Sequence, residues 1–241
     1  MAIGYNPKVV TNGLVLCLDA ANSKSYPGSG NAWYDLTNNK YHMLLINTPT
    51  FGSEGALKYF TLNGTDQYGT CNAAISGSVS ANVSNLGVSG NTPKTVVCIA
   101  NMTANVGSSS GGLFDLGDTG VSGQHYCLRV SSNTATTWRA QFWGTPDYDF
   151  NYNGANVWTM YSVVYGADKI GKTYGNAGVL LGQDGGAFDL VTAGARPFEM
   201  GRYNGSSYVG AKIAMYLIYN KELTVEEIQQ NYNALRGRFE I

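Results

Sequence analysis

Charged residues are scarce in this chain, and several common signals are missing. Only 13% of the 241 residues are Asp, Glu, Lys or Arg, against about 25% in an average soluble domain. The formal net charge of -1 provides no basic field to hold a phosphate backbone, so nucleic-acid binding is not expected. The start of the chain, MAIGYNPKVV, contains no apolar run long enough for a signal peptide or a membrane span. We therefore expect no signal-peptide export and no membrane insertion.

The sequence also lacks the usual zinc motif and offers few bases for a nucleophile. Its four cysteines, Cys17, Cys71, Cys98 and Cys127, are widely spaced and form no CxxC pair, which makes a zinc site improbable. An even number would permit disulfides, but small buried thiols are the simpler interpretation without an export signal. Only two histidines, His42 and His125, are present to serve as the base that a serine nucleophile needs, so serine hydrolase chemistry is not expected.

Glycine and tyrosine are abundant, with 31 and 17 residues. Short apolar or alternating runs separated by Gly and Asn predict many short strands, as in a sandwich. We expect a strand within residues 9–19, a hairpin across Asn63-Gly64, a second hairpin across residues 131–136, and a strong strand over 157–166. Residues 73–92 are almost free of large side chains, which favours a surface loop or a weak edge strand over an interdomain linker. The whole chain, 1–241, is expected to form one domain.

One helix is predicted, over residues 224–235. Thr224 and Glu227 have the spacing of a capping box, and Leu223 and Ile228 that of a hydrophobic staple. Ile228, Tyr232 and Leu235 form an apolar stripe that predicts docking on the sandwich. Gly237 is expected just past the helix end.

The stretch GLVLCLDAANSKSYPGSGNAWYDLTNN changes from an apolar strand to a Gly-rich, aromatic loop. Asp19 and Asp35 lack a third carboxylate and a base, so a catalytic loop is not expected here. Pro27 and Gly28 predict a turn. We expect Trp33 and Leu36 to return and cover the sandwich.

These blocks resemble the concanavalin A-like, laminin-G-like jelly-roll domains of phage and bacterial surface proteins. The matching blocks are GLVLCLDAANSKSYPGSGNAWYDLTNN, TLNGTDQY, VWTMYSVVYGADKIGKTYGNAG and KIAMYLIYNKELTVEEIQQNYNALRGRF. The first and last also look like structural proteins of tailed phages. The resemblance implies an all-β fold of two antiparallel sheets, a jelly-roll sandwich with one short C-terminal helix.

The resemblance also directs the search for sites. Glycosidases of this fold carry alternating carboxylates, E-x-D-x-(x)-E, and no such motif occurs here, so an enzyme is not expected. Related domains use acidic loops for calcium, which makes Asp115 and Asp118 candidate calcium ligands. The resemblance therefore allows calcium as a cofactor. The hairpin block has Thr65-Asp66-Gln67 where two acidic residues are common, which weakens a metal site there.

The segment GTPDYDFNYNG, residues 144–154, is the main candidate for a ligand site. Oxygen-bearing and aromatic side chains alternate in it, so an extended chain would present them on opposite faces. The candidate glycan contacts are Trp143, Asp147, Tyr148, Asp149, Asn151 and Asn153. Trp138 is a further ring for a sugar-stacking platform. The competing interpretation is a strand with a polar outer face and aromatic residues packed inward.

Two functions remain open. The first is a non-enzymatic virion component, a head decoration protein or a tail or fibre subunit, that contacts other virion proteins as a homo-oligomer and is assembled in the host cytoplasm. The second is a carbohydrate-binding module that attaches a particle to host surface glycans. The surroundings of residues 143–153 distinguish the two functions. An open groove there would favour glycan binding, and packing in a subunit interface would favour the virion role.

Overall fold

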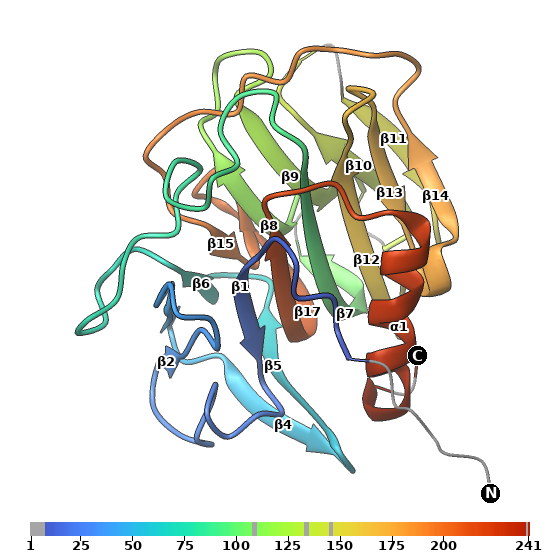
Figure 1. Cartoon of the computed structure of the whole chain (residues 1–241). Coiled ribbons are helices and arrows are strands. Elements are labelled where there is room, and N and C mark those ends of the chain that lie inside the picture. The colour runs from blue at the N-terminus through green and yellow to red at the C-terminus, as the bar shows by residue number, and fades with distance from the viewer. Residues whose placement is uncertain (1–7, 108–109, 133–134, 145–146, 240) are drawn as a thin grey trace, which may run out of the picture.

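The computed structural model describes residues 8–107, 110–132, 135–144, 147–239 and 241, and these form two packed β-sheets (Figure 1). Within these ranges, neighbouring strands of each sheet pair in the antiparallel sense. One helix follows the last strand. The expected fold class, an all-β sandwich of two antiparallel sheets with one C-terminal helix, is therefore confirmed.

The first sheet has the strand order β14-β13-β12-β7-β17-β5-β4, with β1 and β16 also paired to β17. Its strands are β14 (Leu180–Gln183), β13 (Gly171–Tyr174), β12 (Trp158–Tyr165), β7 (Lys94–Gly107), β17 (Ser207–Tyr219), β5 (Leu57–Asn63), β4 (Thr50–Glu54), β1 (Leu14–Asp19) and β16 (Arg202–Tyr203). The first and last strands of the chain, β1 and β17, thus lie side by side and close the fold.

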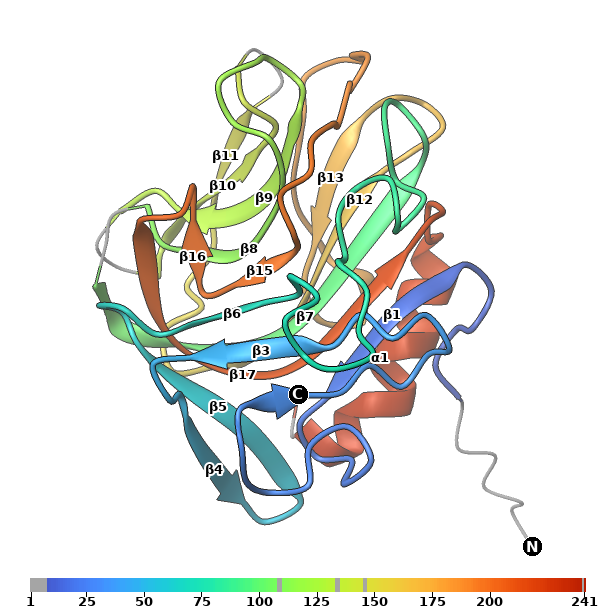
Figure 2. The same ribbon diagram turned by 90° about the vertical axis from the view of Figure 1, so that its left-hand side faces the viewer.

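The second sheet has the order β11-β10-β9-β8-β15-β6-β3-β2, and most of its strands can be followed across Figure 2. They are β11 (Tyr148–Asn151), β10 (Thr137–Gln141), β9 (His125–Val130), β8 (Gly112–Gly117), β15 (Glu199–Met200), β6 (Tyr68–Thr70), β3 (Met43–Ile46) and β2 (Ala32–Trp33). The expected hairpin across residues 131–136 is confirmed as the β9–β10 pair.

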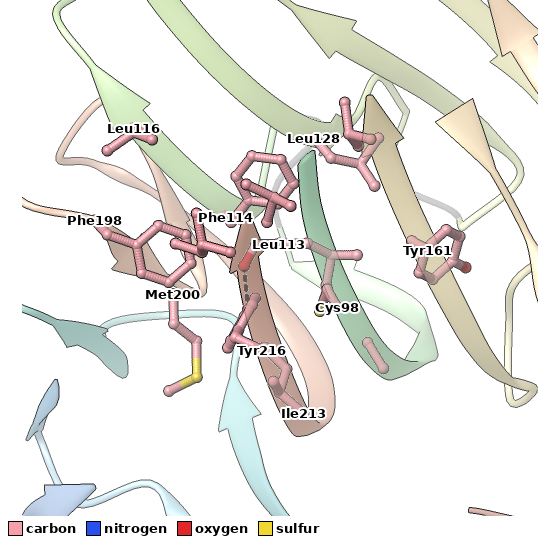
Figure 3. Packing of buried hydrophobic residues seen from close by; sticks show 14 of the residues in the cluster. Cys98, Leu113, Phe114, Leu116, Leu128, Tyr161, Phe198, Met200, Ile213 and Tyr216 are labelled. Carbon is pink, nitrogen blue, oxygen red and sulfur yellow. Dashed lines mark hydrogen bonds between the residues drawn. The ribbon is translucent and has the colours of Figure 1, made fainter. Parts of the chain in front are cut away.

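The main core lies between the two sheets and is rich in aromatic side chains (Figure 3). Phe114 and Leu128 contribute to it from the second sheet, and Tyr216 and Ile213 from the first. The Tyr216 hydroxyl donates a hydrogen bond to the Leu113 carbonyl oxygen at 2.5 Å, which ties the sheets together inside the core. Period-two alternation of apolar residues along the strands produces this core, because every second side chain faces the other sheet.

A second apolar cluster lies on the opposite face of the first sheet, where α1 (Val225–Phe239) packs (Figure 1). The capping box is confirmed: the Glu227 amide donates to Thr224 Oγ1 at 3.3 Å, and the Thr224 amide donates to Glu227 Oε2 at 3.1 Å. Gly237 lies within the helix, so its expected position past the helix end was wrong. The helix continues because Phe239, one turn after Leu235, is also buried against the sheet.

The expected hairpin across Asn63-Gly64 was wrong. β5 pairs with β4 and β17 in the first sheet, whereas β6 pairs with β3 and β15 in the second. The segment is therefore a corner between sheets. Asn63 Oδ1 accepts hydrogen bonds from the amides of Thr65, Asp66 and Gln67 at 2.9, 3.2 and 3.3 Å, and these fix the corner without a ladder between the flanking strands.

The opening stretch covers the core through its tryptophan. Trp33 is fully buried, with its ring 4.9 Å from that of Phe60. Leu36 is exposed, so its expected part in the cover was wrong. Asp35 accepts hydrogen bonds from the amides of Cys17 and Tyr41, at 2.9 and 3.1 Å, and thereby fastens the returning loop to β1.

Residues 73–92 form a loop, and four of its apolar side chains are buried. Ala81, Val83, Leu86 and Val88 are each at most 1% exposed and belong to the main core. The four cysteines are free and buried, as expected. Among the described residues, no helix is long and apolar enough to cross a membrane.

Candidate ligand-binding face

Strand β11 shows the alternation that the sequence indicated. Tyr148 and Phe150 are buried, whereas Asp149 and Asn151 are exposed on the outward side of the second sheet. Asn153, beyond the strand end, is also exposed. The polar side chains of this segment are therefore open to solvent, and its aromatic side chains are packed inward.

Tyr148 is not available to a ligand, which corrects its expected role as a glycan contact. Its ring packs against Phe142 and Phe150 in the core, and its hydroxyl hydrogen bonds with Thr173 Oγ1 at 2.8 Å. Trp138 is fully buried as well, so it forms no sugar-stacking platform. Both side chains face inward because they alternate with the polar residues of the same strands.

Trp143 lies between β10 and β11 and is half-buried. Its backbone has a φ of 66°, a left-handed conformation that is a genuine outlier for a bulky side chain. The Gly123 amide donates to the Trp143 carbonyl oxygen at 3.0 Å, which holds this conformation. The ring lies edge-on to that of His125, at 6.3 Å between centroids. Strained conformations of this kind cluster at functional sites.

Asp147 and Asp149 have different roles. Asp147 Oδ1 accepts a hydrogen bond from the Phe142 amide at 2.7 Å, so it stabilises the turn. Asp149 accepts two hydrogen bonds from Arg139, from Nε at 2.7 Å and from Nη2 at 2.8 Å. These bonds hold the pKa of the Asp149 carboxyl below its usual range. The outward side of β10 and β11 therefore carries a bidentate ion pair beside the exposed amides.

The contacts of Asp115 disfavour calcium at Asp115 and Asp118. Asp115 is buried, and its carboxylate contacts His125 Nε2, Arg196 Nη2 at 3.4 Å and the Asn204 amide at 2.6 Å. Two of these partners are basic side chains, so the oxygens of Asp115 are already occupied by donors. Asp118 lies beside Gly194. Within the described ranges, no group of three or more His, Cys, Asp or Glu residues could hold a metal ion.

The strands around Asp115 present further polar residues that sequence reasoning missed. Each alternates with core residues, so they share the outward side of the second sheet. We call this side the polar face, and it comprises Asp115, His125, Arg129, Arg139, Gln141, Asp147, Asp149 and Glu199, with Arg196, Arg202 and Tyr203 lying over it. The alternation in HYCLRV and TWRAQF carried this signal, but the two strands could not be assigned to one face of one sheet from sequence.

Tyr203 is the central ring of the polar face. It lies 5.1 Å from the Arg129 guanidinium and 5.6 Å from the His125 ring, and its hydroxyl accepts a hydrogen bond from Gln141 Nε2 at 2.9 Å. Burial raises the pKa of Tyr203 to about 12. Gln141 in turn accepts a hydrogen bond from Arg129 Nε. A ring, an amide and a guanidinium are thus fixed together at a partly exposed position.

Asp115 and Glu199 are directly opposite each other on β8 and β15. Glu199 accepts two hydrogen bonds from Arg202, at 2.7 and 2.5 Å, and lies 3.8 Å from Arg196, which also contacts Asp115. Arginine side chains therefore cover this carboxylate pair. A search for carboxylates along single strands could not detect it, because its members are far apart in sequence and meet only across a ladder.

A cavity of about 390 Å³ lies at a different place, beside the Gly-rich opening loop, lined by Gly30, Asn31, Leu45, Thr48 and Pro49. Asn47 and Thr48 have φ values of 56° and 51°. The Gln67 side chain donates to both of their carbonyl oxygens at 3.0 Å. The corner between β5 and β6 therefore holds the rim of this cavity.

No family model matches the chain, and no curated protein matches it in sequence. Among solved structures, a Trypanosoma rangeli sialidase in complex with sialic acid superposes with a TM-score of 0.65 at 17% identity, covering 95% of this chain and 34% of the sialidase. A structure on the cell entry of botulinum neurotoxin type C, described as dependent upon interaction with two ganglioside molecules, superposes with a TM-score of 0.63 at 13% identity, covering 92% of this chain and 51% of that chain. The chain thus spans about a third of the sialidase and about half of the toxin chain. At these identities, the likeness establishes the sandwich fold that the three proteins share.

Proposed function

We propose that this chain is a non-catalytic, lectin-like module that binds a glycan at the polar face. The observation that carries the proposal is Trp143, a half-buried ring held in a strained backbone conformation beside His125. The His125 ring in turn contacts Tyr203, whose hydroxyl is hydrogen bonded to Gln141. Rings that offer a flat face, next to amide and guanidinium groups that orient a ligand, suit a sugar with an apolar face and hydroxyl groups.

The surroundings of this ring support the same chemistry. Asp149 and Asn151 extend the polar face onto the edge strand β11, where their oxygen and amide groups are open to hydroxyl groups of a ligand. The sandwich resembles a sialidase solved with sialic acid and a toxin described with gangliosides. The ligands described for both proteins are glycans or carry them, which supports a binding role on this fold.

The contacts of the buried carboxylates favour binding over hydrolysis. Retaining glycoside hydrolysis needs a nucleophilic carboxylate and a second carboxyl that carries a proton to the leaving group. Asp115 and Glu199 are instead hydrogen bonded to arginine side chains that lie over them. These contacts stabilise the sheet and leave neither carboxylate free to approach a glycosidic carbon.

A glycan array with the purified full chain tests the proposal. We expect binding by the wild-type protein and a loss of about fivefold or more in affinity for Trp143→Ala, since a stacked ring contributes about 1 kcal/mol. Asn31→Ala, on the rim of the separate cavity, is the matched control and should bind like wild type. Arrays with calcium and with a chelator should agree. Absence of binding to every glycan, or equal binding by Trp143→Ala, would contradict the proposal.

We also propose, as a second candidate, that the chain serves as a virion component. The blocks that resemble structural proteins of tailed phages favour this role, and they form β1 with its loop and β17 with α1. Contacts with other virion proteins, or between copies of the chain, would then use the surface outside the polar face. Mass spectrometry of purified particles should detect the chain in a copy number that matches the particle symmetry, and its absence would exclude this role.

A further inference from the structure

Arg129 is a buried cation without a direct ion pair among the described residues. It is 9% exposed, and in the described part of the chain no carboxylate lies within ion-pair distance of it. Its Nε donates to Gln141 and its Nη1 donates to the Val130 carbonyl oxygen at 3.0 Å. The Tyr203 ring adds a cation–π contact. Nη2 has no hydrogen-bond partner among the described residues, so the guanidinium retains donors for a further group.

A second arginine, Arg139, adds positive charge beside Arg129. Arg139 lies directly opposite Arg129 on the adjacent strand, with both side chains on the polar face, and like charges in this position destabilise a sheet. Asp149 neutralises Arg139 from the far side, on β11, and Asp147 Oδ2 lies 4.0 Å from Arg139 Nη1. On the other side of Arg129, the opposite residue is Gly112, which carries no side chain. The ladder therefore supplies a carboxylate to Arg139 but none to Arg129.

We infer that the polar face recognises an acidic saccharide, with Arg129 binding its carboxylate group. This inference rests on the proposed glycan site and adds its ligand class. The planar guanidinium matches a carboxylate geometrically, with parallel N–H donors. Gln141 fixes the orientation of the guanidinium, whose N–H donors form a planar fork, and the Tyr203 ring limits the access of water to it. A carboxylate there would compensate the buried charge, which a neutral sugar cannot do.

Arg129 is the one arginine of the polar face without a direct ion pair among the described residues, and this sets the kind of anion. Polyanions such as sulfated chains or phosphate backbones are held by fields of several positive charges. On the polar face, Arg139, Arg196 and Arg202 are each paired with a carboxylate. One singly charged carboxylate on a saccharide therefore matches the one guanidinium that no described carboxylate contacts directly.

The test compares an acidic oligosaccharide with its carboxyl-reduced form, by calorimetry on the full-length chain. We expect wild type to bind the acidic form about tenfold more tightly or better, as for a hydrogen-bonded charged pair. Arg129→Gln should lose that preference, so that it binds the acidic and the carboxyl-reduced forms with about equal affinity. Arg236→Gln, a change on the exposed side of α1, removes the same charge outside the face and should keep the preference. Arg129→Lys retains the charge without the fork and should show an intermediate preference.

The outcomes separate this inference from the proposed function. Equal binding of the two forms by wild type, or a preference that survives in folded Arg129→Gln, would overturn the carboxylate assignment while glycan binding stands. Absence of binding to either form would overturn both proposals. Circular dichroism and thermal unfolding establish that each variant is folded. If Arg129→Gln does not fold, Arg129→Lys provides the test. An intermediate preference of Arg129→Lys for the acidic form would support the inference, and a preference equal to that of wild type would contradict a role for the planar guanidinium.

Discussion

Lys94 is a buried cation at the start of β7, and we expect its removal to abolish a pH dependence of stability. It is 1% exposed, and its Nζ donates to the Gly90 carbonyl oxygen at 2.7 Å and to Thr192 Oγ1 at 3.1 Å. The Tyr165 ring lies 5.3 Å away. Burial lowers the pKa of Lys94 from 10.5 to about 7, because the charged form loses its hydration.

The direction and size of the effect follow from linkage. Between pH 7 and pH 10.5 the unfolded chain binds more protons at this lysine than the folded chain, so the free energy of unfolding rises with pH. The two pKa values give a rise of about 2 kcal/mol between about pH 6 and pH 8.5, at about 1.36 kcal/mol for each pKa unit. Below about pH 6 both states are protonated and the full destabilisation remains.

Urea unfolding of wild type and Lys94→Met at several pH values measures this difference. For Lys94→Met, the free energy of unfolding should lack the rise of about 2 kcal/mol with pH. The loss of two hydrogen bonds changes the stability of the variant at neutral pH, but it does not restore this dependence. Buried thiols and phenols with raised pKa values, including Cys17, Cys98 and Tyr219, change the stability of both proteins toward alkaline pH, which is why the difference is used. Exposed Lys58→Met is the control and should run parallel to wild type. Parallel curves for Lys94→Met would refute the reasoning.

Three further changes test the packing. Thr224→Ala removes the capping hydrogen bond of α1 and should lower the free energy of unfolding by about 1 kcal/mol in urea. Trp33→Ala empties a fully buried site and should cost about 3–5 kcal/mol, measured in the same way, whereas a change below about 1 kcal/mol would contradict its role as the cover. Gln67→Ala frees the carbonyl groups of Asn47 and Thr48, and hydrogen exchange should become faster at the cavity rim while β7 keeps its protection.

The sequence predicted local features well where they depend on neighbouring residues. The capping box at Thr224, the β9–β10 hairpin and the alternation around Asp149 all follow from spacing along a few residues. The corner at Asn63 was mistaken for a hairpin for the same reason. Asn-Gly permits the tight turn of a hairpin, but the Asn63 side chain also accepts hydrogen bonds from three following amides, which fixes a corner. Only the pairing of β5 and β6 with other strands shows that the segment is a corner and not a hairpin.

The candidate site was only partly predictable, because its residues come from separate strands. Trp143 and Asp149 were found from one segment, whereas Tyr203 reaches the polar face from β16 and contacts Gln141 across 62 residues of sequence. Tyr148 was a candidate glycan contact with inward packing as the alternative, since alternation shows that two sets of side chains diverge but not which set faces the core. Burial in the folded chain resolves that choice.

The arrangement of charges on the polar face explains why the amino-acid composition did not reveal this site. With few charged residues in the whole chain, a basic or acidic site would be expected to appear as a cluster in sequence. Here the cations and carboxylates alternate across neighbouring strands and mostly neutralise one another, as in the pairs of Arg139 with Asp149 and Arg202 with Glu199. Arg129 differs only because its cross-strand neighbours are another arginine and a glycine. A binding preference on this face therefore depends on strand register, and a shift in the pairing of β9 would remove it without changing composition.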